Sequence, residues 1–421
     1  MKIIYIGRFN PFFENSAGAN RLRTLIEGLS DLGVNICLRI TDGYHSQTEA
    51  AKFGSDGKLR EISYRYQCKL IHDKLWRRRI NKFLLLPILY PSLLRIIKKD
   101  IEKEHNIIVW TECDYSFFKL VVKLKECNPD IKSFLEVNEF FDIHRFKKGR
   151  LIHKLEGEKR ANYFIRKGYY AYDGIALMTK TLMKQFMEFP QPGPMLLHLP
   201  MTVDFGRFKG FRNTCIDFDK PYIAFIGVMD DQKEGINILI QAFAQVADEF
   251  PMCKLYLVGS WNYDTPAHLR LISELKLNDR VFWKGEYPRD DIPSILVNAC
   301  LLVLPRPNSK QAQGGFPTKL GEYLATGNPV CATRVGEIPN YLVDGESVFF
   351  AEPDSVKSLA SSIRRALSNP KTAIHVGLNG RKVAEKFFNK DKQALALNDF
   401  FKVMSDEKKM FKNPISIGIN H

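Results

Sequence analysis

The residues with the clearest chemical potential lie in the C-terminal half, between apolar runs over Cys300–Leu304 and Pro329–Thr333. In order they are Gly314, Gly315, Phe316, Pro317, Thr318, Lys319, Leu320, Gly321 and Glu322. The paired glycines let the backbone approach a ligand closely, and Pro317-Thr318 suits the first turn of a helix. Unpaired amides at a helix start bind phosphate, and Lys319 adds positive charge. We expect a phosphate site here, with Glu322 accepting hydrogen bonds from two sugar hydroxyls. The alternative is a glycine loop that only turns the chain, with Glu322 solvated.

A second candidate phosphate element follows the apolar run Tyr222–Ile226. It begins at Gly227 and contains Lys233 shortly before a helical pattern. A loop at the end of a strand, with a lysine before a helix, suits a pyrophosphate. Arg306 also follows a strand end and could add a second cation. For both side chains, a solvated loop position is the alternative.

Two features of the N-terminal half could face a ligand. Gly18 lies in a run of small residues, Ser16–Arg21, which follows the first apolar run and begins a helix. Such a loop exposes amides to a phosphate or sugar oxygen, although glycine loops are common after first strands; for Arg21, a solvent-facing position is an alternative. Glu139 follows the apolar run Ser133–Val137. Its carboxylate could bind hydroxyls, or it could be an acid stabilised by a helix N-terminus.

Short apolar strands alternating with amphipathic helices must position these residues. The predicted strands are Lys2–Ile6, Val34–Ile40, Ile107–Trp110, Ser133–Val137, Gly174–Met178, Tyr222–Ile226, Lys254–Val258, Val281–Trp283, Cys300–Leu304 and Pro329–Thr333. The predicted helices include Asn20–Leu32, Ile236–Phe250, Ser355–Leu367 and Lys392–Met404. Strands apolar on both faces and alternating with helices indicate parallel, doubly wound α/β sheets. The pattern occurs twice, so we predict two Rossmann-like domains facing a central cleft, where such sheets bind ligands.

Composition narrows the class of protein without identifying it. Of the 421 residues, 45% are hydrophobic and 26% are charged, which is typical of a folded chain. The eight cysteines form no CxxC pair, which argues against a metal cluster or a disulfide framework. The N-terminus does not resemble a signal peptide, so we expect a cytoplasmic protein. The net charge of +15 is compatible with nucleic acid, an anionic membrane or a phosphorylated substrate.

A basic and apolar stretch near residue 80 accounts for part of that charge. Trp76, Arg77, Arg78, Arg79 and Lys82 precede an apolar segment interrupted by two prolines. The segment is too short to cross a bilayer. Basic residues beside apolar and aromatic ones favour adsorption to an anionic membrane surface, and a core helix with a solvated basic end is the alternative.

The residues Pro317–Val330 follow the pattern PxKxxEYxAxGxPV, and Asp204–Phe208 reads D-x-x-R-F. In these motifs the chain resembles the retaining glycosyltransferases of family 4, which have the GT-B architecture. The stretch over about residues 200–221 is poor in helix signals, so we predict the domain boundary there. With the resemblance, this gives an acceptor domain over residues 1–205, a nucleotide-sugar donor domain over residues 206–390, and a C-terminal helix and tail over residues 391–421 that could pack back on the N-terminal domain. It places Glu322 on the donor ribose and the turn at Tyr287 along the nucleobase.

Two positions depart from the family pattern. Many members carry a glutamate eight positions before the counterpart of Glu322, where this chain has Gly314. The loop after Gly227 usually supplies an arginine as well as a lysine, and Val228 occupies the arginine position. Arg306 could restore that charge. These departures motivate one alternative, a catalytically silent relative that binds nucleotide or glycan as a partner subunit.

The resemblance implies transfer of a sugar from a nucleoside diphosphate to a hydroxyl of a glycan or lipid-linked glycan, in the synthesis of cell-surface polysaccharide. We expect Glu139, Lys233 and Arg306 to be catalytic and no metal or other cofactor to be required. The expected address is the inner face of the plasma membrane. Stacking aromatics are not interleaved with the basic residues, so nucleic acid is not an expected partner.

Overall fold

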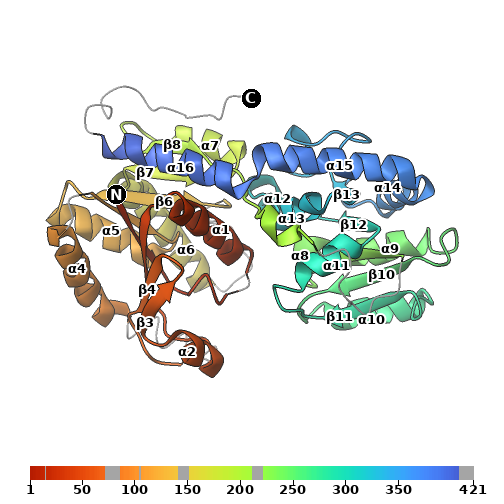
Figure 1. Cartoon of the computed structure of the whole chain (residues 1–421), viewed down its shortest axis with the longest axis horizontal. Helices are drawn as coiled ribbons and strands as arrows, with labels where there is room; N and C mark the ends of the chain where they lie inside the picture. The colour runs from red at the N-terminus through yellow and green to blue at the C-terminus, as the bar shows by residue number, and fades with distance from the viewer. Residues whose placement is uncertain (15, 72–85, 104–105, 141–150, 211–220, 407–421) are drawn as a thin grey trace. The chain divides into compact units, whose positions relative to one another are not determined.

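The computed structural model describes residues 1–14, 16–71, 86–103, 106–140, 151–210 and 221–406 (Figure 1). The chain divides into two compact units. The first contains Met1–Leu199 together with the chain from Gln393 onward, and the second is Pro200–Lys392. Each unit has its own sheet and its own apolar core, so each is described by itself.

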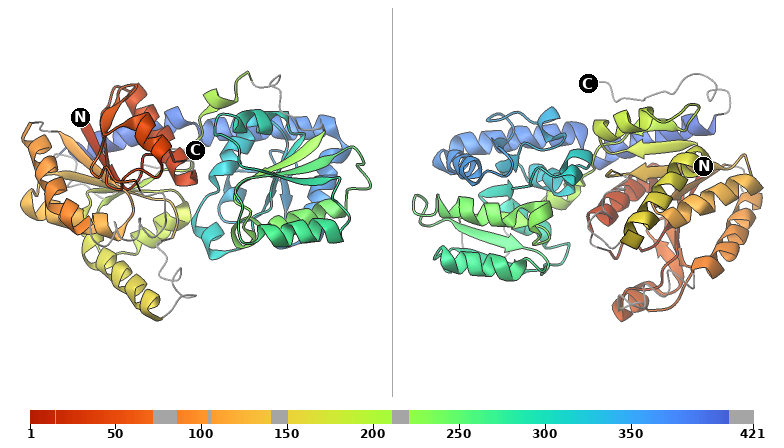
Figure 2. Two further views of the ribbon diagram at one scale, coloured as in Figure 1. Left: turned by 90° about the horizontal axis from the view of Figure 1, so that it is seen from below. Right: turned by 180° about the vertical axis from the view of Figure 1, so that it is seen from behind.

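The N-terminal unit is built on an eight-stranded sheet in the order β3-β4-β2-β1-β5-β6-β7-β8. Its strands are β1 (Lys2–Gly7), β2 (Asn35–Ile40), β3 (Asp56–Leu59), β4 (Ile62–Tyr66), β5 (Ile107–Thr111), β6 (Lys132–Val137), β7 (Gly174–Leu177) and β8 (Met195–His198). Its helices are α1 (Ala17–Asp31), α2 (Gln47–Phe53), α4 (Leu86–Lys103), α5 (Tyr115–Cys127), α6 (Leu151–Tyr163), α7 (Lys180–Met187) and α16 (Lys390–Ser405). Helices cover both faces of this sheet (Figure 2).

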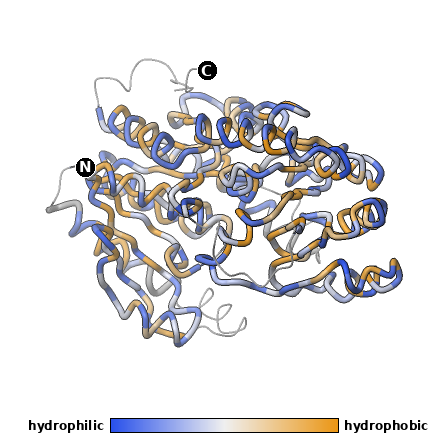
Figure 3. The backbone as a smooth tube through the Cα atoms, turned by 45° about the vertical axis from the view of Figure 1, so that its right-hand side comes forward, coloured by the Kyte–Doolittle hydropathy of each residue, from blue (hydrophilic) through white to orange (hydrophobic). Residues whose placement is uncertain are grey.

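The predicted inner strands form for the reason expected from the sequence. β1 pairs in parallel with β2 and with β5, with Ile4 opposite Cys37 and Val109. Every residue of β5 and of β7 is buried, because helices cover both faces of the sheet. Hydrophobic residues therefore concentrate in the strands, whereas the helices alternate between hydrophobic and hydrophilic residues (Figure 3).

The prediction of entirely parallel sheets is wrong at one edge. Residues Asp56–Tyr66 form β3 and β4, which pair antiparallel, with Gly57 opposite Tyr64. The sequence analysis also missed β8 and the C-terminal β14. All four are short, with three to five residues, and β3 and β4 also lack the continuous apolar run on which the prediction relied.

The C-terminal helix α16 completes the core of the N-terminal unit. Phe400, Phe401 and Met404 are fully buried, and Phe401 packs edge-on against Phe134 with ring centroids 4.8 Å apart. Gly174 makes room for this packing, since a Cβ there would lie 2.6 Å from the ring of Phe400. Two parts of the chain that are far apart in sequence thus share one core.

The C-terminal unit contains a six-stranded sheet in the order β11-β10-β9-β12-β13-β14, and every pairing in it is parallel. Its strands are β9 (Tyr222–Ile226), β10 (Lys254–Val258), β11 (Val281–Gly285), β12 (Leu301–Leu304), β13 (Val330–Thr333) and β14 (Phe349–Ala351). Its helices are α8 (Asp231–Glu234), α9 (Ile236–Ala244), α10 (Thr265–Glu274), α11 (Ile292–Asn298), α12 (Lys310–Gly314), α13 (Thr318–Thr326), α14 (Val356–Ser368) and α15 (Pro370–Phe387). This doubly wound arrangement confirms the predicted Rossmann-like class.

Candidate functional site

The expected helix start after Pro317 is present. Pro317 is the N-cap of α13, and its first helical residue is Thr318. The glycine loop before it differs from expectation, because Gly314 ends the short helix α12 and is not part of an open loop. Gly315 has φ −108° and ψ 166°, an ordinary extended conformation. Neither glycine is among the residues with positive φ, so this turn does not depend on left-handed backbone.

Helix α13 is fixed against the end of β9 by Tyr323. The fully buried hydroxyl of Tyr323 accepts a hydrogen bond from the Ile226 amide at 2.8 Å. Burial raises the pKa of Tyr323 well above its usual range, so the phenol stays protonated. This contact places the start of α13 beside Gly227, the first residue of the other predicted phosphate loop.

Lys319 reaches underneath that loop. Its Nζ lies 2.7 Å from Oε2 of the buried Glu234 and 4.6 Å from the ring centroid of Phe225. A Cβ at Gly227 would lie 2.1 Å from the same Nζ, so a glycine is needed for the lysine to pass. Burial lowers the pKa of Lys319, and the adjacent Glu234 carboxylate opposes this shift. Lys319 thus belongs to a buried ion pair as well as to the helix start.

Three basic side chains, Lys319, Arg306 and Lys233, lie near the carboxyl ends of the central strands β9 and β12. The positive charges of Arg306 and Lys233 both lower the pKa of Lys319, after the larger effect of burial. Arg306 is buried, and its carbonyl accepts a hydrogen bond from the Thr333 hydroxyl at 2.6 Å. Gly235 packs on the same loop, since a Cβ there would lie 2.3 Å from the Pro305 carbonyl oxygen. The structure therefore brings together the three basic side chains that the sequence placed on separate loops.

The start of helix α8 holds Lys233 in place. Asp230 caps this short helix, and its Oδ1 accepts a hydrogen bond from the Lys233 amide at 3.0 Å. The Lys233 side chain is half-buried. Its position on a capped turn, rather than on an open loop, argues against the solvated alternative.

The loops that follow β9, β10 and β11 are bound to one another. The Gly227 amide donates to the Val258 carbonyl at 2.8 Å, and the Gly259 amide donates to the Gly285 carbonyl at 2.8 Å. Gly259 has φ 152°, and a Cβ there would lie 1.6 Å from the Gly227 carbonyl oxygen. Tyr287, predicted near a nucleobase, is half-buried on the third of these loops.

Glu322 lies on the half-buried face of α13 and has a partner that the sequence analysis did not assign. Arg207 Nη1 donates to Glu322 Oε1 at 2.6 Å, and Arg207 Nη2 donates to the Arg289 carbonyl at 2.9 Å. Phe316, another predicted donor-site residue, is buried instead. Its ring packs against Phe388 and Tyr341, with centroids 5.2 and 5.6 Å away.

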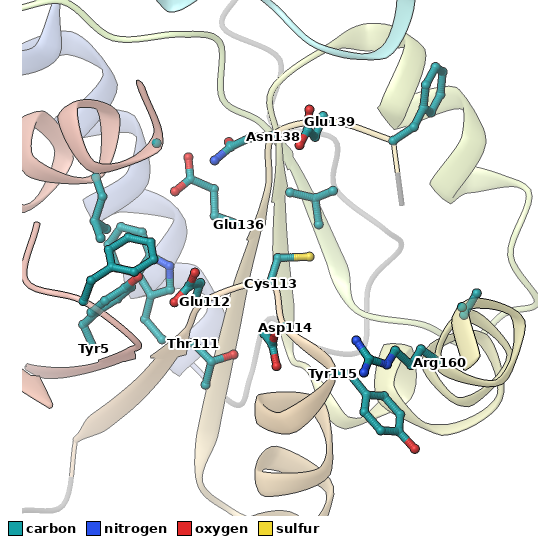
Figure 4. A pocket seen from close by; sticks show the side chains of 18 residues that line it. Tyr5, Thr111, Glu112, Cys113, Asp114, Tyr115, Glu136, Asn138, Glu139 and Arg160 are labelled. Carbon is teal, nitrogen blue, oxygen red and sulfur yellow. The ribbon is translucent and has the colours of Figure 1, made fainter. Parts of the chain in front are cut away.

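The N-terminal unit contains a cavity of about 410 Å³ at the carboxyl ends of β5 and β6 (Figure 4). Gly18 and Glu139, two of the residues predicted to face a ligand, both line it. The cavity is also lined by acidic, aromatic and basic side chains. These are Glu112, Asp114 and Glu136, then Tyr5, Phe9, Trp110, Tyr115 and Phe140, and Arg160. Carboxylates that accept hydroxyl hydrogen bonds, set among aromatic rings, suit a polyhydroxylated ligand.

One wall of this cavity is braced by a buried ion pair. Arg21 is fully buried and its Nε donates to Glu136 Oε1, while its Nη2 donates to the Leu199 carbonyl at 2.7 Å. The solvent-facing alternative for Arg21 is therefore wrong. The sequence signal that could have revealed its place is the position of Arg21 one turn into a helix that is otherwise apolar on that side.

The floor of the cavity carries an unusual carboxyl group. Burial raises the pKa of Glu112 from 4.5 to about 7, and the hydrogen bond from the Arg8 amide at 2.9 Å opposes this shift. Asp114 lies close by and caps α5 by accepting the Ser116 amide at 2.8 Å. Glu112 can thus hold or release a proton near neutral pH. The sequence analysis missed it because its environment depends on β1 and β5 lying side by side.

Neither a metal site nor a membrane span emerges from the part of the chain that the structure describes. No group of three or more His, Cys, Asp or Glu side chains is placed there to hold a metal ion. Nor does any helix there combine the length and apolarity needed to cross a membrane. The residues predicted to contact a membrane surface, Trp76, Arg77, Arg78, Arg79 and Lys82, lie outside the described ranges.

Several solved structures share the fold of this chain over nearly its whole length. Sucrose-phosphate synthase from Thermosynechococcus elongatus superposes with a TM-score of 0.70 at 18% identity, covering 95% of this chain and 98% of that one. Anabaena Alr3699/HepE, solved in complex with UDP, superposes with a TM-score of 0.67 at 13% identity, covering 96% and 100%. At these identities the likeness establishes the GT-B fold alone.

Curated relatives have higher sequence identity to this chain, but over a shorter part of it. An MMP alpha-(1->4)-mannosyltransferase from Mycolicibacterium hassiacum is 27% identical over 47% of this chain and 46% of its own. A 2-deoxystreptamine glucosyltransferase from Streptomyces kanamyceticus is 28% identical over 45% of this chain and 47% of its own. The matched segments thus span about half the length of these relatives. The model of the family described as "Glycosyl transferases group 1" matches residues 208–383, which contain the donor-site candidates from Gly227 to Glu322. Residues 208–383 thus form a domain of the group 1 glycosyl transferases.

Proposed function

We propose that this protein transfers a sugar from a nucleoside diphosphate to a hydroxyl of a glycan or lipid-linked glycan, with retention of the anomeric configuration. The observation that carries the proposal is that the segments bearing Lys233, Arg306 and the start of α13 meet at the carboxyl ends of β9 and β12. They meet through the ion pair of Glu234 with Lys319 and the close approach of Gly235 to the Pro305 carbonyl. These groups suit a diphosphate, whose negative charge increases as the sugar leaves.

The ribose and the base of the donor would bind at the same end of the C-terminal sheet. Glu322, one turn into α13, would accept hydrogen bonds from the ribose hydroxyls. The turn after β11, with Gly285 and Tyr287, would lie along the base. Gly314 stands where many relatives carry an acid near the donor sugar, so other groups must select the sugar. The solved complex of the similar fold with UDP supports a nucleoside diphosphate as the donor class.

The acceptor is assigned to the cavity of the N-terminal unit. Glu139 and the neighbouring acids would accept hydrogen bonds from acceptor hydroxyls, and the aromatic walls would pack against the apolar faces of a ring. In the transfer, the acceptor oxygen forms the new bond to the anomeric carbon as the bond to the leaving phosphate breaks. The donor phosphate takes the acceptor proton, so the step requires no added acid or base.

Names of the relatives support the reaction class, since they include mannosyl- and glucosyltransferases. We also propose attachment to an anionic membrane surface through residues 76–82, where a lipid-linked acceptor would lie. Removing the charges of Arg77, Arg78 and Arg79 should weaken binding to anionic liposomes, more so at low salt. Liposome binding that is unchanged by these substitutions would contradict the attachment.

The decisive experiment measures diphosphate release from a panel of UDP-, GDP- and TDP-sugars, with and without a membrane lipid extract. Release from one donor that depends on the extract would support transfer to a lipid-linked acceptor. Tight nucleotide binding without release from any donor would favour a catalytically silent relative. The absence of both binding and release would overturn the donor site.

A further inference from the structure

Arg207 lies in a short turn of 3-10 helix, Phe205–Phe208, that precedes the C-terminal sheet. Asp204 caps this turn by accepting the Gly206 amide at 2.9 Å. Phe208, the next residue, is buried and anchors the turn to the unit. The backbone that carries Arg207 is therefore held from both sides.

The guanidinium of Arg207 joins two elements of the candidate donor site. Nη1 donates to Glu322 Oε1 on α13 at 2.6 Å, and Nη2 donates to the Arg289 carbonyl at 2.9 Å. The Arg207 side chain is 14% exposed and that of Glu322 is 24% exposed. Arg289 lies on the loop that follows β11, the loop assigned to the base.

This geometry limits what the Glu322 carboxylate can do. Arg207 engages one of its two oxygens, and within the described part of the chain the other has no hydrogen-bond donor. A carboxylate with one oxygen held loses rotational freedom before a ligand arrives, which favours one bound orientation. The planar guanidinium donates through two separate nitrogens, Nη1 to Glu322 and Nη2 to the Arg289 carbonyl, whereas a lysine would have to bond both from one ammonium nitrogen.

We propose that Arg207 is a positioning residue for ribose recognition, holding Glu322 in the orientation that accepts the ribose hydroxyls and tying it to the base loop. The inference rests on the proposed donor site. It adds Arg207 to that site and assigns to it a preference for ribose over deoxyribose. Arg207 itself does not touch the reacting atoms. Its loss should therefore reduce discrimination between ribose and deoxyribose rather than abolish nucleotide binding.

The test is a titration of the full chain with UDP and GDP, and with the 2′-deoxy and 3′-deoxy analogues of whichever binds. For the unaltered protein we expect the ribonucleotide to bind about tenfold more tightly than either analogue, the loss of one hydrogen bond to a charged group. In Arg207→Ala this ratio should fall to about one, as it should in Glu322→Ala. The double variant should show no further loss, because both single changes remove the same interaction.

Arg364→Ala is the matched control, since it breaks an exposed arginine–glutamate pair with Glu249 in the same unit. It should keep the full ratio. If Arg207→Ala does not fold, as judged by circular dichroism and thermal unfolding, Arg207→Lys is tested in its place. We expect this variant to have a reduced ratio of ribonucleotide to deoxynucleotide affinity and a native melting temperature.

Two results would overturn the inference. An unchanged ratio in Arg207→Ala, beside a lost ratio in Glu322→Ala, would show that Glu322 needs no positioning. Tighter ribonucleotide binding in Arg207→Ala would show that Arg207 competes with the ligand for the carboxylate. If the unaltered protein bound neither nucleotide, the proposed donor site would fail and the inference with it, and these outcomes are distinguishable.

Discussion

Lys319 Nζ lies 2.7 Å from Glu234 Oε2, and the two side chains are 18% and 5% exposed. The lysine comes from the start of α13 and the glutamate from the end of α8. This ion pair therefore joins the two segments that the sequence analysis identified independently as phosphate elements. Because Glu234 already balances the charge of Lys319, the proposed diphosphate site depends more on Lys233 and Arg306.

Breaking this pair should destabilise the C-terminal unit. Glu234→Gln leaves the Lys319 ammonium without its carboxylate, and a buried charge that loses its partner costs about 3 kcal/mol. Urea unfolding should show a lower midpoint for Glu234→Gln. The exposed pair of Arg364 and Glu249 offers a control, where Glu249→Gln should cost under about 1 kcal/mol. Equal costs for the two variants would contradict the account of a buried pair.

Lys233→Ala should slow turnover without unfolding the protein. The side chain is half-buried and contributes charge to the proposed diphosphate site, and removing one such group lowers the rate about a hundredfold. Steady-state diphosphate release measures this effect, with thermal unfolding as a check on folding. Lys310→Ala is a matched control, because Lys310 is an exposed lysine at the start of α12. Undiminished activity in Lys233→Ala would remove Lys233 from the site.

Glu112 should make stability depend on pH. Its pKa rises from 4.5 in the unfolded chain to about 7 in the fold, so between these values the folded state binds a proton that the unfolded state has lost. The contribution is fully present below about pH 4.5, declines as the pH rises and is lost above about pH 7, a change of at most about 3 kcal/mol.

Glu112→Gln cannot ionise, so its stability relative to the unaltered protein should be greater at pH 8 than at pH 5. Urea unfolding at the two pH values measures the difference. Glu126→Gln, which alters an exposed carboxylate on α5, should show the same relative stability at both. If the difference in free energy of unfolding between Glu112→Gln and the unaltered protein were the same at pH 5 and pH 8, the raised pKa would be contradicted.

The C-terminal helix should be essential for the stability of the N-terminal unit. Phe400 on α16 is fully buried beside Gly174, and removing a buried phenyl ring costs about 3–5 kcal/mol. Phe400→Ala should therefore lower the midpoint of chemical unfolding strongly. Leu395→Ala alters a residue of the same helix that is 49% exposed and should have little effect. A neutral Phe400→Ala would mean that α16 contributes little to this core.

Local sequence determined the alternation of strands and helices, because strands buried on both faces must be continuously apolar and helices must show one apolar stripe. Hence the inner strands from β1 to β13 and the start of α13 after Pro317 were predictable. The motif from Pro317 to Val330 likewise indicated the family from the sequence alone. The edge strands β3 and β4 were not predictable, since their sequences, DGKL and ISYRY, lack the continuous apolar run of the inner strands.

Only the tertiary structure decided which side chains meet. Arg21 and Glu136 are 115 residues apart in sequence, as are Arg207 and Glu322, yet each pair forms a hydrogen-bonded ion pair. Such contacts depend on the order of strands in the sheets, which no local pattern encodes. The same holds for Glu112, whose pKa is set by burial between neighbouring strands. The sequence by itself therefore determined the classes of residue at the phosphate loops, and the packing of strands and helices decided which of them act together.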